Sequence, residues 1–102
     1  TYRWREGETE TAYVDKIASA IEAAHPRSGM AARLKDGEYE AWARESFEAA
    51  MTRVYVEGLV RGRAPTASYR RAAYRVAAPA IALAGYRLAA MLDRLLSNDA
   101  RA

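Results

Sequence analysis

The longest apolar pattern in the sequence runs from Val76 to Leu96. Its apolar residues recur at gaps of one, three and four positions, which is the stripe of an amphipathic α-helix. Arg87, Asp93 and Arg94 lie off the stripe, so we expect these side chains to stay in water. An apolar face of this length is stable only when something packs against it. The stripe consists of Val76, Ala80, Leu83, Ala84, Leu88, Met91, Leu92 and Leu95.

A first helix is expected over residues 12–24, with Thr9 or Thr11 as its N-cap. It should end at His25, because the residue before a proline avoids the helical region of backbone space. The spacing of its apolar residues defines one face that we expect to be buried. That face holds Tyr13, Ile17, Ala20, Ile21 and Ala24.

A second helix is expected over residues 38–57, with Gly58 at its end. The connector before it, residues 26–37, contains turn signals, and we expect one short helical turn near residues 30–34. The side chains on the inner face of the second helix should pack under the long apolar stripe. They are Trp42, Ser46, Ala49, Ala50, Arg53 and Val54, with Phe47 and Met51 beside them.

The third helical segment should start at Tyr69, with Ser68 as its cap. Pro79 lies inside this segment and removes one backbone hydrogen bond, so either the helix kinks there or two helices meet there. We expect a kink, because the apolar period continues through the proline. Alanine is abundant, valine and isoleucine are scarce, and no period-two alternation occurs. The predicted fold class is therefore all-α, with three long helices plus a short helical turn in a single region, residues 1–102.

Charge is divided unevenly along the chain. Residues 1–57 hold eight Lys/Arg and eleven Asp/Glu, a balance of −3, and residues 58–102 hold eight and two, a balance of +6. The ordinary explanation is a solvated arginine face that pairs with the acidic first half, and the pattern favours it. The alternative is a partner that bears phosphates, bound by basic side chains with Tyr69 and Tyr74 among them. Those candidates are Arg61, Arg63, Arg70, Arg71 and Arg75.

The residue types needed for catalysis are nearly missing. His25 is the only histidine and there is no cysteine, whereas a zinc site needs three or four ligands. Glu38, Glu40, Glu45 and Glu48 are expected on a solvated helix face. There is no glycine-rich phosphate loop, no uncharged apolar run long enough to span a membrane, and no signal peptide at the start. On residue content alone, we assign no catalytic and no metal-binding residue.

Several short motifs occur in an order typical of one family. They are Trp42-Ala43-Arg44-Glu45-Ser46, then Val54-Tyr55, then Tyr69, then Ala77-Ala78-Pro79, then AGYRLAAMLDRLL at residues 84–96. Together they resemble the C-terminal region of the zinc-dependent, single-strand-specific nucleases of the S-one/P-one type, which are related to the all-α zinc phospholipases C. The resemblance covers roughly residues 40–96.

The resemblance implies a fold and an activity. The fold would be the C-terminal part of the phospholipase C/P-one nuclease-like all-α fold, part of a larger domain. The activity of the whole molecule would be that of an endonuclease and 3′-nucleotidase, in which zinc-bound water attacks the phosphorus of single-stranded DNA or RNA. In the family the zinc ligands and an Asn-Leu-His-x-x-Trp-Asp motif precede the region matched here. Only structural roles therefore carry over, to Trp42, Ser46, Tyr55, Pro79 and Leu88.

The same resemblance implies the partners of this chain. We expect it to be inactive alone and to pack against an N-terminal catalytic portion, either a separate chain or one lost by proteolysis. The abrupt start at Thr1 favours a processed piece. Zinc would belong to the complete enzyme, whose location would be periplasmic or secreted, with no membrane partner. The alternative is a small helical interaction module with no enzymatic parent, binding nucleic acid through its arginine-rich second half.

Overall fold

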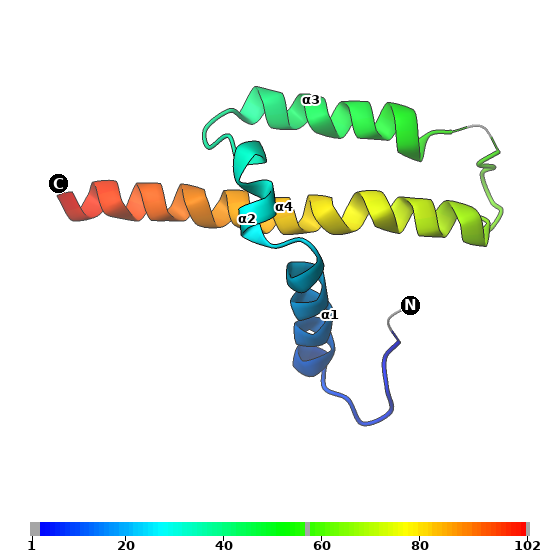
Figure 1. The fold of residues 1–102 in the computed structure, drawn as a ribbon. Helices are drawn as coiled ribbons and strands as arrows, with labels where there is room; N and C mark the ends of the chain where they lie inside the picture. Colours follow the sequence, from blue (N-terminus) through cyan, green and yellow to red (C-terminus); the bar gives the residue numbers. More distant parts are fainter. Residues whose placement is uncertain (1–2, 57, 102) are drawn as a thin grey trace.

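All regular structure in the computed structural model is helical over the residues it describes, 3–56 and 58–101, with side chains described as far as Ser97. The prediction of an all-α fold is thus confirmed (Figure 1). Three α-helices carry most of the chain, and a short helical stretch lies in the first connector as expected. The elements are α1 Glu10–Ala24, α2 Arg27–Met30, the 3₁₀ turn η1 Ala31–Arg33, α3 Tyr39–Ala49, the π-helical turn η2 Ala50–Val54 and α4 Ala67–Arg101.

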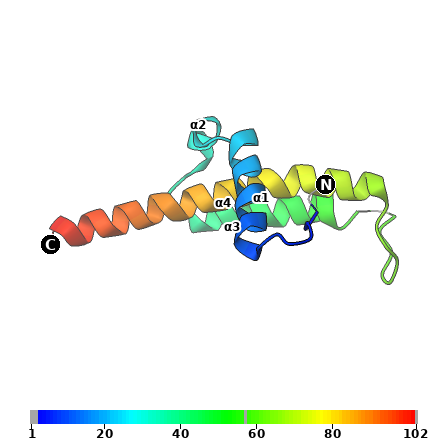
Figure 2. The ribbon, with the colours of Figure 1, turned by 90° about the horizontal axis from the view of Figure 1, so that it is seen from below.

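Helix α4 is the axis of the molecule. It is 35 residues long, and α3 runs antiparallel beside its first half (Figures 1 and 2). Helix α1 approaches α4 steeply from the other side, and α2 lies across the middle of α4. The C-terminal part of α4 extends beyond these contacts, which gives the molecule extents of 54 × 39 × 24 Å.

Helix α1 begins where its cap is satisfied. The Thr9 hydroxyl accepts a hydrogen bond from the Ala12 N–H at 3.1 Å, so Thr9 rather than Thr11 is the N-cap. The helix ends at Ala24, and Pro26 follows its C-cap residue, His25, as predicted. On the predicted face Ile21 is buried and Tyr13, Ile17 and Ala20 are half-buried, whereas Ala24 is exposed.

The second long helix is shorter than predicted. It changes at Ala50 into a π-helical turn, in which the Tyr55 N–H donates to the Ala50 carbonyl at 2.9 Å, and it ends at Val54. The Thr52 hydroxyl donates to the Glu48 carbonyl at 2.7 Å and so competes for the backbone acceptor that an α-helix would use. Gly58 follows with φ +94° in the loop, not at the helix end, while Glu57 lies outside the described residues.

Helix α4 starts two residues earlier than predicted. Thr66, not Ser68, is the capping residue, because its hydroxyl accepts from the Tyr69 N–H at 3.1 Å. The helix then continues through Pro79, so the alternative of two helices meeting there is wrong. The ribbon of α4 keeps its direction without a sharp break across its middle, so the expected sharp kink at Pro79 is not seen either (Figure 1).

The core lies where α1 and α2 reach the middle of α4. Ala78 and Ala82 are buried there although both lie outside the predicted stripe, since small side chains let α1 and α2 approach closely. Of the predicted stripe, only Leu83 is fully buried; Val76 and Met91 are half-buried and the remaining members are exposed. The buried set is Ile21, Met30, Ala78, Ala82 and Leu83, with Ile17, Leu34 and Tyr86 packed against it.

Helix α4 also has the length and composition of a membrane-crossing helix. Within Ala67–Ser97 one 18-residue window reaches a mean hydropathy of 1.3, and this is the one such helix in the described part of the chain. Arg87 and Asp93 interrupt its apolar run, which is why no uncharged segment of that length stands out in the sequence. In the fold its middle serves as the core helix against which α1 and α2 pack.

Candidate functional site

Arg87, on α4, contacts both α3 and the connector before α3. Its Nη2 lies 2.7 Å from Glu45 Oε2 and 2.8 Å from the Arg33 carbonyl oxygen, which also accepts from Nε at 3.3 Å. The side chain is only 11% exposed, so the expectation that Arg87 stays in water is wrong. Glu45 is likewise half-buried rather than on a solvated face. A charge-assisted pair with low exposure holds geometry better than a surface pair does.

Trp42 forms the apolar side of the same contact. The Arg87 guanidinium lies 4.7 Å from the centre of the Trp42 ring, and Tyr39 meets that ring edge-on at 5.1 Å. The Trp42 Nε1 is buried without a hydrogen-bond partner in the described structure. The Tyr39 hydroxyl is 3.7 Å from the Met91 sulfur, which ties the start of α3 to α4. The tryptophan and glutamate of the W-A-x-E-S segment therefore both contact Arg87 of α4.

A second ion pair lies further along α4. Arg94 Nε is 2.6 Å from Asp36 Oδ2, and this hydrogen bond raises the pKa of the Arg94 guanidinium above its usual value. Arg94 is 42% exposed, so the pair is screened by water and contributes less than the Arg87 contact.

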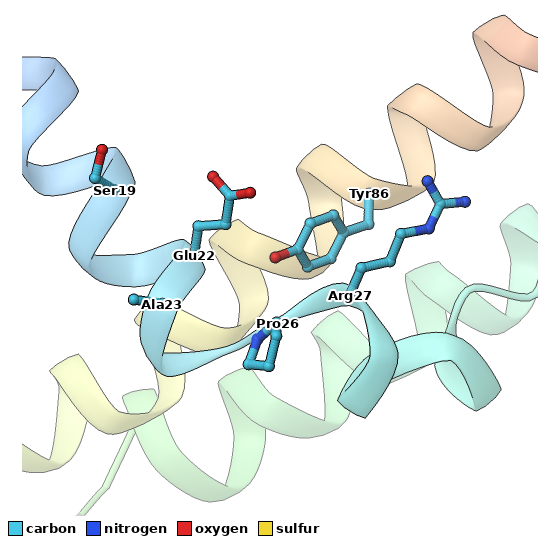
Figure 3. Close-up of a pocket in the computed structure, with 6 residues that line it drawn as sticks. All are labelled: Ser19, Glu22, Ala23, Pro26, Arg27 and Tyr86. Atoms are coloured by element: carbon cyan, nitrogen blue, oxygen red, sulfur yellow. The ribbon is translucent and has the colours of Figure 1, made fainter.

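A shallow hollow lies between α1, α2 and α4 (Figure 3). Its volume is about 390 Å³, and its lining residues are Ser19, Glu22, Ala23, Pro26, Arg27 and Tyr86. The Tyr86 hydroxyl is already engaged, because it donates to the His25 carbonyl at 2.8 Å. The lining holds one carboxylate, Glu22, and one serine, Ser19, but no histidine, no cysteine and no second carboxylate, so it presents neither a pair of carboxylates nor a nucleophile paired with histidine.

The described residues do not fit a zinc site. Nowhere in residues 3–56 and 58–97, the part of the chain whose side chains the structure describes, do three His, Cys, Asp or Glu side chains gather as metal ligands. His25, the only histidine, is the C-cap residue of α1. A catalytic zinc needs three protein ligands and an open position for water. We therefore derive no metal-dependent step from this chain.

The five candidate arginines are all exposed. Arg61 and Arg63 lie in the loop between η2 and α4, and Arg70, Arg71 and Arg75 lie in the first three turns of α4. This loop and the start of α4 occupy one end of the molecule (Figure 1). The structure thus brings the arginines to one end, while their binding role stays a prediction.

The residues to which structural roles were assigned differ in burial. Trp42 and Pro79 are half-buried, Tyr55 and Leu88 are 73% and 51% exposed, and Ser46 is exposed. Their roles stay predictions. The contacts that sequence reasoning missed are those of Arg87 and Tyr86. One signal was present: Arg87 follows Leu83 by four positions, so it lies on the same side of α4 as the most buried leucine.

Comparison with known proteins gives one family. The family model described as S1/P1 Nuclease matches residues 2–97. Searches among curated proteins and among solved structures find no match. The matched range includes all of α1, α2 and α3 and nearly all of α4. The chain therefore belongs to the S1/P1 nuclease family.

Proposed function

We propose that this chain is the C-terminal structural portion of a zinc-dependent nuclease that hydrolyses phosphodiester bonds of single-stranded nucleic acids. Family membership supports a nuclease-type function. The observation that carries the proposal is the match over residues 2–97 in a chain whose described residues gather no set of metal ligands. Catalytic residues and zinc ligands would then come from an N-terminal portion of the same protein.

The apolar surface of the chain supports this division. The C-terminal part of α4 exposes Leu88, Leu92, Leu95 and Leu96, at 51%, 46%, 46% and 64%. Helix α3 and its π-turn expose Phe47 and Met51, at 66% and 58%. Exposed apolar surface of this kind is typical of an interaction site. We infer that the catalytic portion packs on it.

The role of the chain's own residues in such an enzyme is structural. Arg87, Glu45 and Trp42 fix α3 against α4, and that pair presents the apolar surface on which the catalytic portion docks. Zinc, when bound in the assembled enzyme, would activate water and stabilise charge on the phosphate. A periplasmic or secreted location belongs to the same proposal and rests on the family alone.

The alternative hypothesis was a helical interaction module with no enzymatic parent. Family membership argues against that hypothesis, because it supplies an enzymatic parent. The nucleic-acid contact that the alternative included is compatible with a nuclease.

The experiment is zinc-dependent hydrolysis of single-stranded DNA by the purified chain, alone and mixed with the N-terminal catalytic portion of an S1/P1 nuclease. We expect the chain alone to bind no zinc and to cut nothing, and the mixture to regain activity. The double variant Leu92→Lys with Leu95→Lys tests the docking surface. It should abolish the recovery of activity, because it places charge on that surface. Cleavage by the chain alone, lost on His25→Ala, would overturn the proposal, because a metal site would then exist on this chain.

A further inference from the structure

We propose that the peptide bond between Arg63 and Ala64 is a site of limited proteolysis by a serine endoprotease that selects arginine, and that the two resulting chains remain one folded protein. The bond lies in the loop that leads into α4, residues 58–65. Limited proteolysis concentrates at exposed loops, because a helix must unfold before a protease can bind its backbone in extended form. Neither half of this proposal requires the proposed nuclease function.

The loop of residues 58–65 is exposed throughout and projects beyond the ends of α3 and α4 (Figures 1 and 2). Its side chains make no hydrogen bond or ion pair with any described residue. Its backbone makes two long turn contacts within the described chain. The Leu59 N–H donates to the Val56 carbonyl at 3.3 Å, and the Arg63 N–H donates to the Val60 carbonyl at 3.2 Å. Opening this loop for a protease therefore breaks few interactions.

The local backbone favours the bond after Arg63 over the bond after Arg61. Arg61 and Gly62 are the central residues of the turn that the Arg63 N–H closes, and Gly62 has a φ of +82°. The bond between them must leave that turn before it can be extended. Ala64 precedes Pro65, and the residue before a proline is restricted toward extended conformations. The residues after Arg63 are therefore already suited to an extended binding site.

Arg63 also supplies the side chain that such a protease selects. Its guanidinium is charged at all physiological pH values and makes no ion pair with a described residue, so it can enter an acidic specificity pocket without losing a contact. The serine hydroxyl of the protease attacks the Arg63 carbonyl carbon, the bond to the Ala64 nitrogen breaks, and the amine leaves with a proton. Water then hydrolyses the acyl-enzyme. One water is consumed, and the products carry a new carboxylate on Arg63 and a new ammonium on Ala64.

Lys35 shows why a cation in a loop is not by itself a cleavage site. It lies in the connector before α3, but its carbonyl accepts a hydrogen bond from the Glu38 N–H at 3.0 Å. The next residue, Asp36, is bound by Arg94 of α4 at 2.6 Å. The bond after Lys35 is therefore inside a closed turn that is tied to α4. The arginines of α3, η2 and α4 lie in helices, where several backbone hydrogen bonds would have to break first.

The two chains should stay together because their contacts lie away from the loop. The first chain, residues 1–63, holds α1, α2 and α3, and the second, residues 64–102, holds α4. Arg87, Arg94 and Tyr86 of α4 hydrogen-bond to the first chain. Cleavage removes the covalent link and leaves these contacts in place. The buried set is also shared, with Ile21 and Met30 from the first chain and Ala78, Ala82 and Leu83 from the second.

The test is limited digestion of the purified chain with trypsin, followed over time by intact mass spectrometry. The fragments expected first are residues 1–63 and 64–102. Arg63→Gln should slow the cutting of the loop at least about tenfold, because the specificity pocket loses its charged partner. Arg61→Gln is the matched control, since it makes the same charge change two residues away in the same loop. It should change the rate less than about twofold.

A further variant tests whether the loop is cut in the folded protein. Tyr86→Phe removes the hydrogen bond to the His25 carbonyl and leaves the loop unchanged. If cleavage required global unfolding, this variant should raise the rate about fivefold, in proportion to the unfolded population. We expect a change of less than about twofold, because local opening of the loop is sufficient.

Size-exclusion chromatography of the cleaved protein tests the second half of the proposal. Both fragments should elute together at the volume of the uncut chain, and they should separate only in urea. Fragments that elute apart without denaturant would overturn this half. The first half would be overturned by a first cut at any other bond between residues 10 and 96, by equal slowing in Arg63→Gln and Arg61→Gln, or by the fivefold rise in Tyr86→Phe.

Discussion

Two stretches of α4 have similar sequences and different surroundings. In the middle, Ala78, Ala82 and Leu83 are buried, with Leu83 at 2% exposure. Nine and thirteen residues beyond Leu83, Leu92 and Leu96 are 46% and 64% exposed. Both stretches have apolar residues at helical spacing. The difference is that α1 and α2 cover the middle, while no described residue covers the end to the same extent.

The arginines of the two stretches show the same difference. Arg87, in the covered part, is 11% exposed and has a carboxylate, a carbonyl and an aromatic ring as partners. Arg94, in the uncovered part, is 42% exposed and pairs with Asp36. An exposed pair is worth little, whereas removing one partner of a shielded pair leaves an uncompensated charge. Periodicity thus predicts a helix and its apolar face. How much the side chains of each stretch contribute to stability depends on what packs over them.

The largest effect should come from shortening a side chain in the covered stretch. Leu83→Ala should lower the free energy of unfolding by about 3 kcal/mol, because it removes buried methyl groups and leaves a cavity. Leu95→Ala, the matched change in the uncovered stretch, should cost less than about 0.5 kcal/mol. Urea unfolding followed by circular dichroism at 222 nm gives both values. Equal costs would contradict the division of α4 into covered and uncovered parts.

A somewhat smaller loss is expected at the α3–α4 contact. Trp42→Ala should cost about 2–3 kcal/mol, because the ring is half-buried between Arg87 and Tyr39. Trp4→Ala is the control: Trp4 is 53% exposed and touches Tyr13 at a ring distance of 4.8 Å. Its loss should cost under 1 kcal/mol. Thermal melting of both variants tests the contrast, and equal melting temperatures for Trp42→Ala and the parent would show that α3 is not held through this ring.

A single hydrogen bond between α4 and the end of α1 gives the next effect. Tyr86→Phe removes the bond from the tyrosine hydroxyl to the His25 carbonyl and should cost about 1 kcal/mol. Tyr39→Phe loses only a contact of 3.7 Å to the Met91 sulfur and should cost a few tenths at most. Urea unfolding can rank the two variants, and a larger cost for Tyr39→Phe would place the main polar tie in the uncovered stretch instead.

The local features of the fold were predictable because they depend on neighbouring residues. The helical period predicted α1 and α4, and the proline after His25 predicted the end of α1. The cap of α4 was misplaced because Thr66 and Ser68 are both competent caps, and only the hydrogen bond to Tyr69 distinguishes them. In the π-turn the Thr52 hydroxyl donates to the Glu48 carbonyl and so competes for a backbone acceptor. No periodicity reveals that competition.

The contacts between helices were not predictable from local pattern. Arg87 was assigned to solvent because it lies off the apolar stripe, and its partner Glu45 lies 42 positions away, beyond the reach of any local pattern. Ala78 and Ala82 are buried because α1 crosses α4 there, and alanine gives no signal of that by itself. The exposure of the α4 arginines was implicit in the charge pattern. The direction in which their side of α4 points required the position of η2, which only the fold supplies.

The smallest expected effect concerns the start of α1, which lies away from the covered stretch. The Arg5 N–H and the Lys16 ammonium bond to the Glu8 carboxylate at 3.2 Å, and they hold the pKa of Glu8 below its usual value of 4.5. A lowered pKa in the folded state adds stability above the unfolded pKa, and that stability is lost as pH falls through the folded pKa. Glu8→Gln should remove this part of the loss in unfolding free energy as the pH falls. Glu22→Gln is the control. The pH at which the protein unfolds in acid is followed through Trp42 fluorescence in a Trp4→Phe background. Because Trp42 contacts Arg87 of α4, a shift of this pH reports on α4 rather than on α1. A shift seen there would show that α1 unfolds together with the covered stretch. A shift seen only through Trp4, in a Trp42→Phe background, would show that α1 opens alone and that the cover over α4 is weaker than the buried residues indicate.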